Sequence, residues 1–465
     1  MKEKQAVKRG GLDGFFGITA SGSNMKTEIM AGITSFVTIA YALIANPGIV
    51  GGVVTENVDA IKNGVFIATC LGAFIGTFLC AVYAKVPFVQ ASGMGLISFF
   101  AYTVIAGMGY SYGGALAIVL VSGIICVLLT VTGVRTNIVK AVPESVKSAM
   151  TAGIGLFITI IGMKSAGIVV ANPGTLVGLA NFAAWRDGAD LATTVYPPLV
   201  ALLGLIVMAA LQVKRVNGNI LIGILVATIV GIPLGVTSFA NFDMNIGQKF
   251  VDFANVSFLA IDFTDMMKNG IFPVIILVIS FLLVTIFDSL GTLLGACKQA
   301  GLVDKDGNAL YMKESMMCDS IATVAGACCG ISTVATVVEC GAGIAAGGKT
   351  GMSSLTTALC FLAAIVLAPF IAIIPSAATA PAMIFVGVLM MGSIVAVDFG
   401  SMENALPAFC TIVFMPFTYS IANGVAFGLA TDILIKICTG KFKQINLLCV
   451  AIVIIFVIRY AFLAG

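Results

Sequence analysis

Long apolar stretches, separated by short polar connections, run along almost the whole chain. A helix needs roughly 20 apolar residues to cross the hydrocarbon core of a bilayer, and the spacing of polar positions predicts fourteen spans, two of them short. They cover residues 28–50, 62–83, 92–109, 112–133, 146–168, 196–213, 218–236, 270–295, 314–330, 335–348, 351–374, 380–397, 405–419 and 421–438. The pattern predicts an all-α polytopic membrane protein.

One predicted span differs from the others in its residue composition. Residues 331–351 read ISTVATVVECGAGIAAGGKTG, a β-branched run followed by a run of small residues, with Glu339 at the boundary. β-Branched residues favour extended backbone, and small residues allow close approach of neighbouring helices. We therefore expect a short strand and then a half-helix that begins near Glu339. A carboxylate at membrane depth indicates a functional site.

The same segment contains a literal G-x-x-x-x-G-K-[ST] pattern, from Gly343 to Thr350, which is typical of phosphate-binding loops. Such a loop needs a soluble βαβ context, and the chain has no water-soluble stretch long enough to provide one. We therefore interpret Lys349 as a charge at the cytoplasmic end of a span.

Two pairs of segments indicate an internal repeat. VTIAYAL at 37–43 resembles VTIFDSL at 284–290, and ASGMG at 91–95 resembles ECGAG at 339–343, at offsets of 247 and 248 residues between the aligned positions (288 − 41 and 339 − 91). A repeat of seven spans must be inverted in the membrane, because seven is odd. The half-helix of span three is then expected to start at Ser92, acting as its N-cap.

Composition agrees with a membrane protein and limits its chemistry. Hydrophobic residues make up 60% of the 465 residues, charged residues 10%, and the mean hydropathy is +1.12. Most of the 24 lysines and arginines, Arg135 among them, fall on the side of the N-terminus in the predicted topology, which places residues 1–27 in the cytoplasm. The net charge of +3 is thus a topology signal, and no nucleic-acid partner is predicted.

The chain contains no histidine, and its twelve cysteines are scattered singly apart from Cys328 and Cys329. No metal site and no cofactor are predicted from this pattern, and the cysteines are expected to be reduced packing residues. A membrane-embedded enzyme would need a nucleophile with a base, or metal ligands. We therefore predict that the protein is not an enzyme, and any proton relay must use carboxylates.

A second candidate carboxylate lies in the span at 270–295. Thr285, Asp288, Thr292 and Gly295 recur at helical spacing and are expected to share one face. A carboxylate at the bilayer centre costs at least about 2.5 kcal/mol, so Asp288 is expected to be paired, protonated or hydrated.

For several other residues the sequence allows either a role in the site or a structural role. Tyr41 could donate into the site or pack, Phe99 and Phe100 could stack on a flat ligand or pack, and Asn46 with Pro47 is expected to end span one. In a separate span, Asp432 and Lys436 are four residues apart and are expected to form an interfacial ion pair.

Several separated motifs resemble one family of transporters over nearly the whole chain. They are FDSLGTLLGACKQAGLVDKDG at 287–307, VECGAGIAAGGKTG at 338–351, TIAYALIANPGI at 38–49, GMGLISFFAYTV at 93–104 and MPFTYSIANGVAFG at 415–428. These segments resemble the AzgA-like purine permeases, a branch of the nucleobase transporters. The resemblance implies fourteen spans in two inverted repeats, with core and gate domains.

In this chain the core domain is then expected at 28–133 and 270–374 and the gate domain at 146–236 and 380–438. The apolar segment at 439–465 has no partner in this scheme; it either spans the membrane or lies along its surface. The resemblance also implies import of adenine, guanine or hypoxanthine across the plasma membrane by proton symport.

By motif, Asp288 and Glu339 match the binding carboxylates of the family, and either could carry the coupling proton. The expected substrate-binding residues are Glu339, Asp288, Thr292, Val338, Cys340, Ser92, Gly93, Tyr41 and Thr38. A nucleobase has adjacent N–H groups that one carboxylate can accept.

The chain departs from the family at three positions: Ser92 replaces a proline, Ile97 an asparagine and Lys349 an arginine. Loss of the amide at Ile97 leaves the cargo open, with xanthine, uracil or a small anion as alternatives. A passive channel and a homodimer also stay open.

Overall fold

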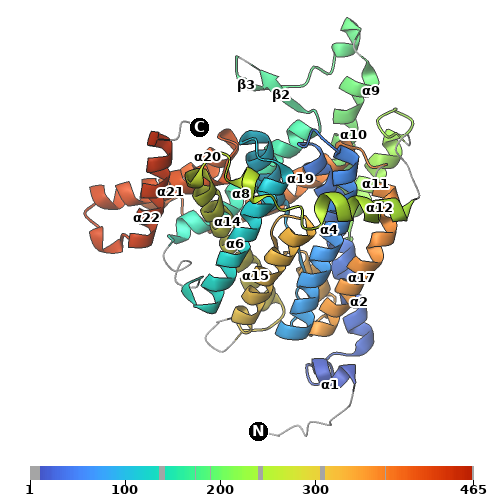
Figure 1. Cartoon of the computed structure of the whole chain (residues 1–465), viewed down its shortest axis with the longest axis horizontal. Coiled ribbons are helices and arrows are strands. Elements are labelled where there is room, and N and C mark those ends of the chain that lie inside the picture. Colours follow the sequence, from blue (N-terminus) through green and yellow to red (C-terminus); the bar gives the residue numbers. More distant parts are fainter. Residues whose placement is uncertain are drawn as a thin grey trace.

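The computed structural model describes residues 11–135, 142–172, 174–188, 190–238, 245–303, 309–371 and 373–462. Residues 1–10 and 463–465, part of the two predicted terminal segments, lie outside these ranges. Within them the chain is a helical membrane protein with two small pairs of strands. Figure 1 shows long helices side by side, with the β2–β3 hairpin projecting from one end and helix α1 near the other.

The first part of the chain, up to residue 231, contains the following helices and strands. They are α1 Leu12–Phe16, α2 Met25–Ile39, α3 Tyr41–Gly51, α4 Val58–Leu79, β1 Gln90–Ser92, α5 Met94–Ser98, α6 Tyr112–Val131, α8 Glu144–Ser165, β2 Val169–Asn172, β3 Leu176–Leu179, α9 Leu191–Thr194, α10 Tyr196–Val213 and α11 Asn219–Gly231. Helices α4 and α5 continue as π-helical turns over Cys80–Ala84 and Phe99–Gly107.

The second part repeats the alternation of long and interrupted elements. It contains α12 Ile246–Asp252, α13 Phe263–Met266, α14 Ile271–Gln299, α15 Met312–Cys329, β4 Val334–Thr336, α16 Cys340–Ala345, α17 Gly351–Ala364, α18 Ala368–Ile371, α19 Ser376–Met391, α20 Met402–Phe417, α21 Ile421–Cys438 and α22 Leu447–Phe462. A π-helical turn over Phe253–Ser257 follows α12, and 3-10 turns cover Ala184–Asp187, Ile365–Leu367, Gly392–Ala396 and Phe442–Gln444.

Nine helices in the described part of the chain are long and apolar enough to cross a membrane, and four shorter apolar helices accompany them. The prediction of an all-α membrane protein is therefore confirmed. The shorter helices include Met94–Gly107 in predicted span three, Asn219–Gly231, Met402–Phe417 and Leu447–Ile458. The last of these shows that the C-terminal apolar segment is helical.

The helices pack in two groups. Helix α17 packs against α2 and α4, while α15 packs against α4 and α6. In the other group α8 packs against α19, α20 and α21, and α10 packs against α11 and α19. In Figure 1, α20, α21 and α22 lie at the opposite side of the molecule from α2 and α17. Contacts of α3 with α19 and of α5 with α8 join the two groups.

The strands that precede the two half-helices pair with each other inside the fold. β1 and β4 are antiparallel, with Gln90 opposite Thr336 and Ser92 opposite Val334. All six strand residues are buried. Extended backbone inside a membrane protein needs hydrogen-bonding partners, and each strand supplies them for the other. Each strand leads within a few residues into a short helix, as the sequence predicts.

Two predictions about these elements are wrong in detail. Pro47 does not end a helix, because it lies inside α3, which continues to Gly51. Ser92 does not cap α5: the N-cap is Gly93, without a side-chain bond, and the Ser92 hydroxyl lies 3.1 Å from that of Ser332. The short strand predicted before Glu339 is present as Val334–Thr336.

The segment with the phosphate-loop pattern binds an internal carboxylate. Glu28 of α2 is fully buried, and its two carboxylate oxygens accept the backbone N–H groups of Lys349 and Thr350, at 3.0 and 3.3 Å. These amides precede α17, where the helix dipole favours a negative charge. The bond ties α2 to the start of α17, and the amides are already occupied by Glu28.

The Asp265 carboxylate holds the segment between α12 and α14 against the residue before α6. Asp265 accepts the backbone N–H of Ser111 at 2.7 Å and contacts the Lys268 ammonium at 2.8 Å. Partial burial tends to raise the pKa of Asp265, but the hydrogen bonds from Lys268 and Ser111 outweigh it and lower the pKa below its ordinary value. This carboxylate therefore stabilises the folded state while it is ionised.

Candidate functional site

A cavity of about 450 Å³ lies where the strand pair meets α3, α8, α14 and α19. Volumes of 300–1,000 Å³ are typical of small-molecule sites. Apolar side chains, Leu96, Ile154, Val284 and Leu389 among them, form much of the wall. The polar groups are few, which is the usual arrangement of a site that orients a largely apolar ligand.

Both predicted carboxylates line this one cavity. Glu339 is the N-cap residue of α16, so the half-helix begins where the sequence predicts. Asp288 projects from α14, and a Cβ atom on Gly93 would lie 3.7 Å from its Oδ2. The absence of a side chain at Gly93 therefore leaves room beside the Asp288 carboxylate.

Tyr41 belongs to the site rather than to the packing alone. Its hydroxyl donates to Oε1 of Glu339 at 2.6 Å, across 298 residues of sequence. Tyr41 is the first residue of α3 and is almost fully buried. The bond fixes one oxygen of Glu339 and leaves the other as an acceptor.

The remaining predicted residues divide between the cavity and the protein interior. Thr292, Ser92, Gly93 and Val338 line the cavity with the two carboxylates and Tyr41. Thr292 also donates back to the carbonyl oxygen of Asp288 at 3.0 Å. The exposed fraction of Val338 is 61%, so this side chain borders the opening.

Some candidates do not face the cavity. Thr38 donates to the carbonyl of Thr34 on its own helix, and Cys340 is buried beside the site without lining it. Thr285 and Gly295 share a helix with Asp288 but also lie outside the lining, so the predicted polar stripe is only half correct.

The two phenylalanines are packing residues. Phe99 and Phe100 are buried, and their rings lie edge-on to Phe281 and Tyr112, at 4.8 and 6.1 Å between centroids. Neither lines the candidate cavity, which favours the packing interpretation.

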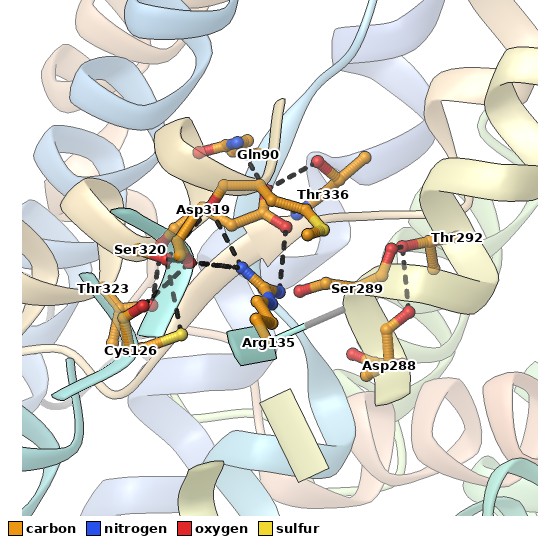
Figure 2. A network of polar contacts seen from close by, with 12 residues as sticks. Gln90, Cys126, Arg135, Asp288, Ser289, Thr292, Asp319, Ser320, Thr323 and Thr336 are labelled. Atoms are coloured by element: carbon orange, nitrogen blue, oxygen red, sulfur yellow. Dashed lines mark hydrogen bonds and ion pairs between the residues drawn. The ribbon is translucent and has the colours of Figure 1, made fainter. Parts of the chain in front are cut away.

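Beside the site lies a buried charged network that was not predicted from the sequence (Figure 2). Asp319 of α15 accepts the Gln90 amide at 2.6 Å and the Thr336 hydroxyl and backbone N–H at 2.8 and 3.2 Å, all on Oδ1. Gln90 and Thr336 are register partners at the end of the strand pair. One carboxylate thus holds both strands that lead to the cavity, and Asp319 is a positioning residue.

Arg135 supplies the opposite charge. Its Nη2 lies 4.0 Å from Oδ2 of Asp319, and its Nη1 donates to the Met316 carbonyl and the Ser320 hydroxyl, at 3.0 and 3.3 Å. Both charged side chains are fully buried. Arg135 follows the end of α6, and its guanidinium points into the protein interior. Burying two charges is costly, and the ion pair together with the hydrogen bonds at Nη1 of Arg135 and Oδ1 of Asp319 offsets part of that cost.

A signal in the sequence could have found Asp319. It is a carboxylate inside the apolar stretch 314–330, and the criterion that selected Asp288 and Glu339 applies to it equally. The ion pair of Asp432 and Lys436 is confirmed at 2.7 Å, with side chains 7% and 12% exposed. The described residues contain no group of three or more Cys, Asp and Glu that could hold a metal ion.

Comparisons with solved structures place the fold among known transporters. The transmembrane domain of the cyanobacterial bicarbonate transporter BicA matches with a TM-score of 0.61 at 18% identity, covering 86% of this chain and 97% of that domain. SLC26A9 matches with a TM-score of 0.62 at 12% identity, covering 92% of this chain and 68% of that protein. At these identities the likeness concerns the fold alone.

Sequence comparisons extend over nearly the whole chain. A putative permease of Methanocaldococcus jannaschii is 37% identical over 98% of this chain and 99% of its own length. The adenine permease AdeP of Escherichia coli is 33% identical (99% and 98% covered), and the guanine/hypoxanthine permease PbuO of Bacillus subtilis is 34% identical (94% and 97% covered). The profile described as "Permease family" matches residues 26–427. The chain therefore belongs to this Permease family, in its AzgA-like branch, and is a transmembrane transporter rather than an enzyme.

Proposed function

We propose that the protein imports a purine nucleobase, hypoxanthine, guanine or adenine, across the plasma membrane by proton symport. One observation carries this proposal: Glu339 and Asp288 line a single apolar cavity, with one oxygen of Glu339 fixed by Tyr41. The names of the relatives, adenine permeases and guanine/hypoxanthine permeases, support the cargo.

The chemistry of the cavity suits a flat, neutral ring with a polar edge. A carboxylate accepts adjacent N–H groups of a base, while the valine, leucine and isoleucine side chains cover its faces. One of the two carboxylates, Glu339 or Asp288, then binds the base, and the other carries the coupling proton. We assign Thr292, Ser92, Gly93 and Val338 to the walls of the base site.

We further propose that fourteen spans form two inverted repeats. The antiparallel pairing of β1 with β4 supports this arrangement, because two inverted copies of one interrupted span would meet in that way. The core domain comprises 28–133 and 270–374 and the gate domain 146–236 and 380–438, which agrees with the two packing groups of helices. The N-terminus is then cytoplasmic, by the distribution of basic residues.

A small anion is the alternative cargo that one observation favours, since the fold matches that of a bicarbonate transporter. Two carboxylates on the cavity wall count against it, because like charges repel. Xanthine and uracil remain alternatives among the nucleobases.

Uptake of radiolabelled hypoxanthine, guanine and adenine by cells that express the chain tests the proposal. We expect saturable uptake of at least one base that stops when the proton gradient is dissipated. Saturable uptake that ignores the gradient would refute symport, and no uptake of any base would refute the cargo.

The site is tested by Glu339→Gln and Asp288→Asn, which keep the side-chain size and remove the charge. Both should abolish uptake while the protein is still found in the membrane. Glu144→Gln is the matched control, because the Glu144 side chain is 82% exposed and does not line the cavity. Near-normal uptake by either site variant would remove that residue from the mechanism.

A further inference from the structure

Helices α3 and α19 contact each other, and the candidate site lies at one end of this contact. A second cavity, of about 520 Å³, lies at the other end. Pro47 and Gly48 of α3 and Gly52, directly after that helix, line it, together with Ser376 and Thr379 at the start of α19. The candidate site is lined instead by the start of α3 and the end of α19. The two cavities are therefore distinct, and none of the proposed base-binding residues lines the second one.

Two lysines line this second cavity, and neither has a partner among the residues that the structure describes. Lys249 of α12 is 94% buried, since its exposed fraction is 6%, yet no ion pair or hydrogen bond holds its ammonium group. Lys62 of α4 also lines the cavity, and its stem crosses α3 at Gly51, where a Cβ atom would lie 2.4 Å from Cε. A buried ammonium without a partner is costly, so its environment should offer an anion.

The nearby carboxylates do not neutralise these lysines. Asp252 is occupied by two amides, Asn63 at 2.7 Å and Gln248 at 2.9 Å. Asp59 lines the cavity but forms no ion pair with either lysine in the described part of the chain. The side chains that line the cavity therefore carry a net positive charge, two lysines against one aspartate.

The backbone adds to this charge. Helix α19 has sixteen residues and begins at Ser376, after Pro375, and no side chain caps its N-terminus. The first N–H groups of a helix lack partners within the helix and favour an anion. Pro375 and Ser376 both line the cavity, so the positive end of α19 opens toward the same space as Lys249 and Lys62.

We propose that this cavity binds a small inorganic oxyanion, sulfate or phosphate. Several acceptor oxygens let such an ion contact both ammonium groups and the start of α19 at once, which a monatomic ion could not do as well. The volume also holds the ion with a few waters. The bound ion would join α4 and α12 to α19 and so stabilise the packing seen here.

Thermal unfolding of the purified full-length chain in detergent tests this proposal with sodium sulfate as the probe. Sodium gluconate at the same ionic strength serves as the reference, because screening alone changes with salt. We expect the midpoint temperature to rise saturably with sulfate. A rise that is the same in gluconate, or that does not saturate, would overturn the proposal.

Lys249→Met and Lys62→Met locate the effect. Loss of one charge-assisted contact should weaken the apparent sulfate affinity about 10-fold or more. Without sulfate, Lys249→Met should be at least as stable as the wild type, because an unpaired buried charge is removed. Lys268→Met is the control, since Lys268 pairs with Asp265 outside this cavity, and it should keep the full response. An unchanged sulfate response in Lys249→Met and Lys62→Met would overturn the proposal.

A lipid phosphate could supply the same chemistry, and reconstitution distinguishes the two sources. In bilayers of phosphatidylcholine alone we expect sulfate to stabilise the protein as it does in detergent. If only added phosphatidylglycerol stabilises it, through Lys249, the inorganic-anion proposal is wrong. Lys249→Met should still take up the nucleobase, so failure of the anion site and failure of the proposed transport function can be told apart.

Discussion

The contact between Tyr41 and Glu339 allows a sharp test of the proposed mechanism. Tyr41→Phe removes only the hydroxyl that donates to Oε1 of Glu339 at 2.6 Å. The ring of Tyr41 is 2% exposed, and phenylalanine fills the same volume without opening a cavity. The carboxylate then loses the bond that orients it before substrate binds.

The size of the effect follows from the cost of ordering the freed side chain. Immobilising a flexible side chain at an interface costs about 0.5–1.5 kcal/mol. This corresponds to roughly a 2- to 12-fold weaker apparent affinity. We expect the half-saturation concentration for the transported base to rise by this factor, with the maximal rate changed much less, because the carboxylate itself is still present.

Initial rates of hypoxanthine uptake over a range of concentrations measure this prediction, corrected for the amount of protein in the membrane. Tyr83→Phe is the control, because Tyr83 is 57% exposed and should respond like the wild type. An unchanged half-saturation concentration in Tyr41→Phe would show that the contact does not prepare the site. Complete loss of uptake at normal protein level would also contradict the reasoning, since the hydroxyl would then act directly in transport.

Three further results are expected from other parts of the molecule. Asp319→Asn leaves the buried Arg135 without its opposite charge, so it should lower uptake and reduce the free energy of unfolding by up to about 3–5 kcal/mol. Normal values for both would exclude a positioning role. Gly95→Ala should slow uptake, because its Cβ would lie 2.7 Å from Cγ2 of Ile154, whereas Gly295→Ala, whose Cβ meets nothing within 4 Å and lies outside the cavity, should not; equal rates would show that Ile154 moves aside without cost. The pKa of Asp265 is lower in the folded than in the unfolded state, so its ionised carboxylate stabilises the fold above the unfolded pKa. This stabilisation is lost as the pH falls through the folded pKa. Asp265→Asn should therefore lower the unfolding temperature at neutral pH and match the wild type in acid. A difference that persists in acid would contradict this explanation.

Much of the fold follows from local patterns in the sequence. Apolar length predicts the helices, because each span must satisfy its own backbone in the membrane. The change from β-branched to small residues predicts the strand and the half-helix at Glu339, because both signals lie within a few adjacent residues. Asp288 and Glu339 were found in the same way, as charges in apolar surroundings.

Other features could not be derived from any local pattern. The bond from Tyr41 to Glu339 joins residues 298 positions apart, and the Gln90–Asp319 bond joins residues 229 apart. The direction in which a side chain points depends on helix rotation, which packing decides: Asp288 and Thr292 face the cavity, and Thr285 does not.

The sequence by itself thus determined that the chain crosses a membrane, where the interrupted span lies, and which two carboxylates belong to the candidate site. Only the tertiary structure decided the partners of those charges, the burial of Arg135 against Asp319, and the two cavities at the α3–α19 contact. The physical reason is that hydrophobicity acts on each segment separately. Hydrogen bonds and ion pairs need two groups within about 3–4 Å, which only the packed fold brings together.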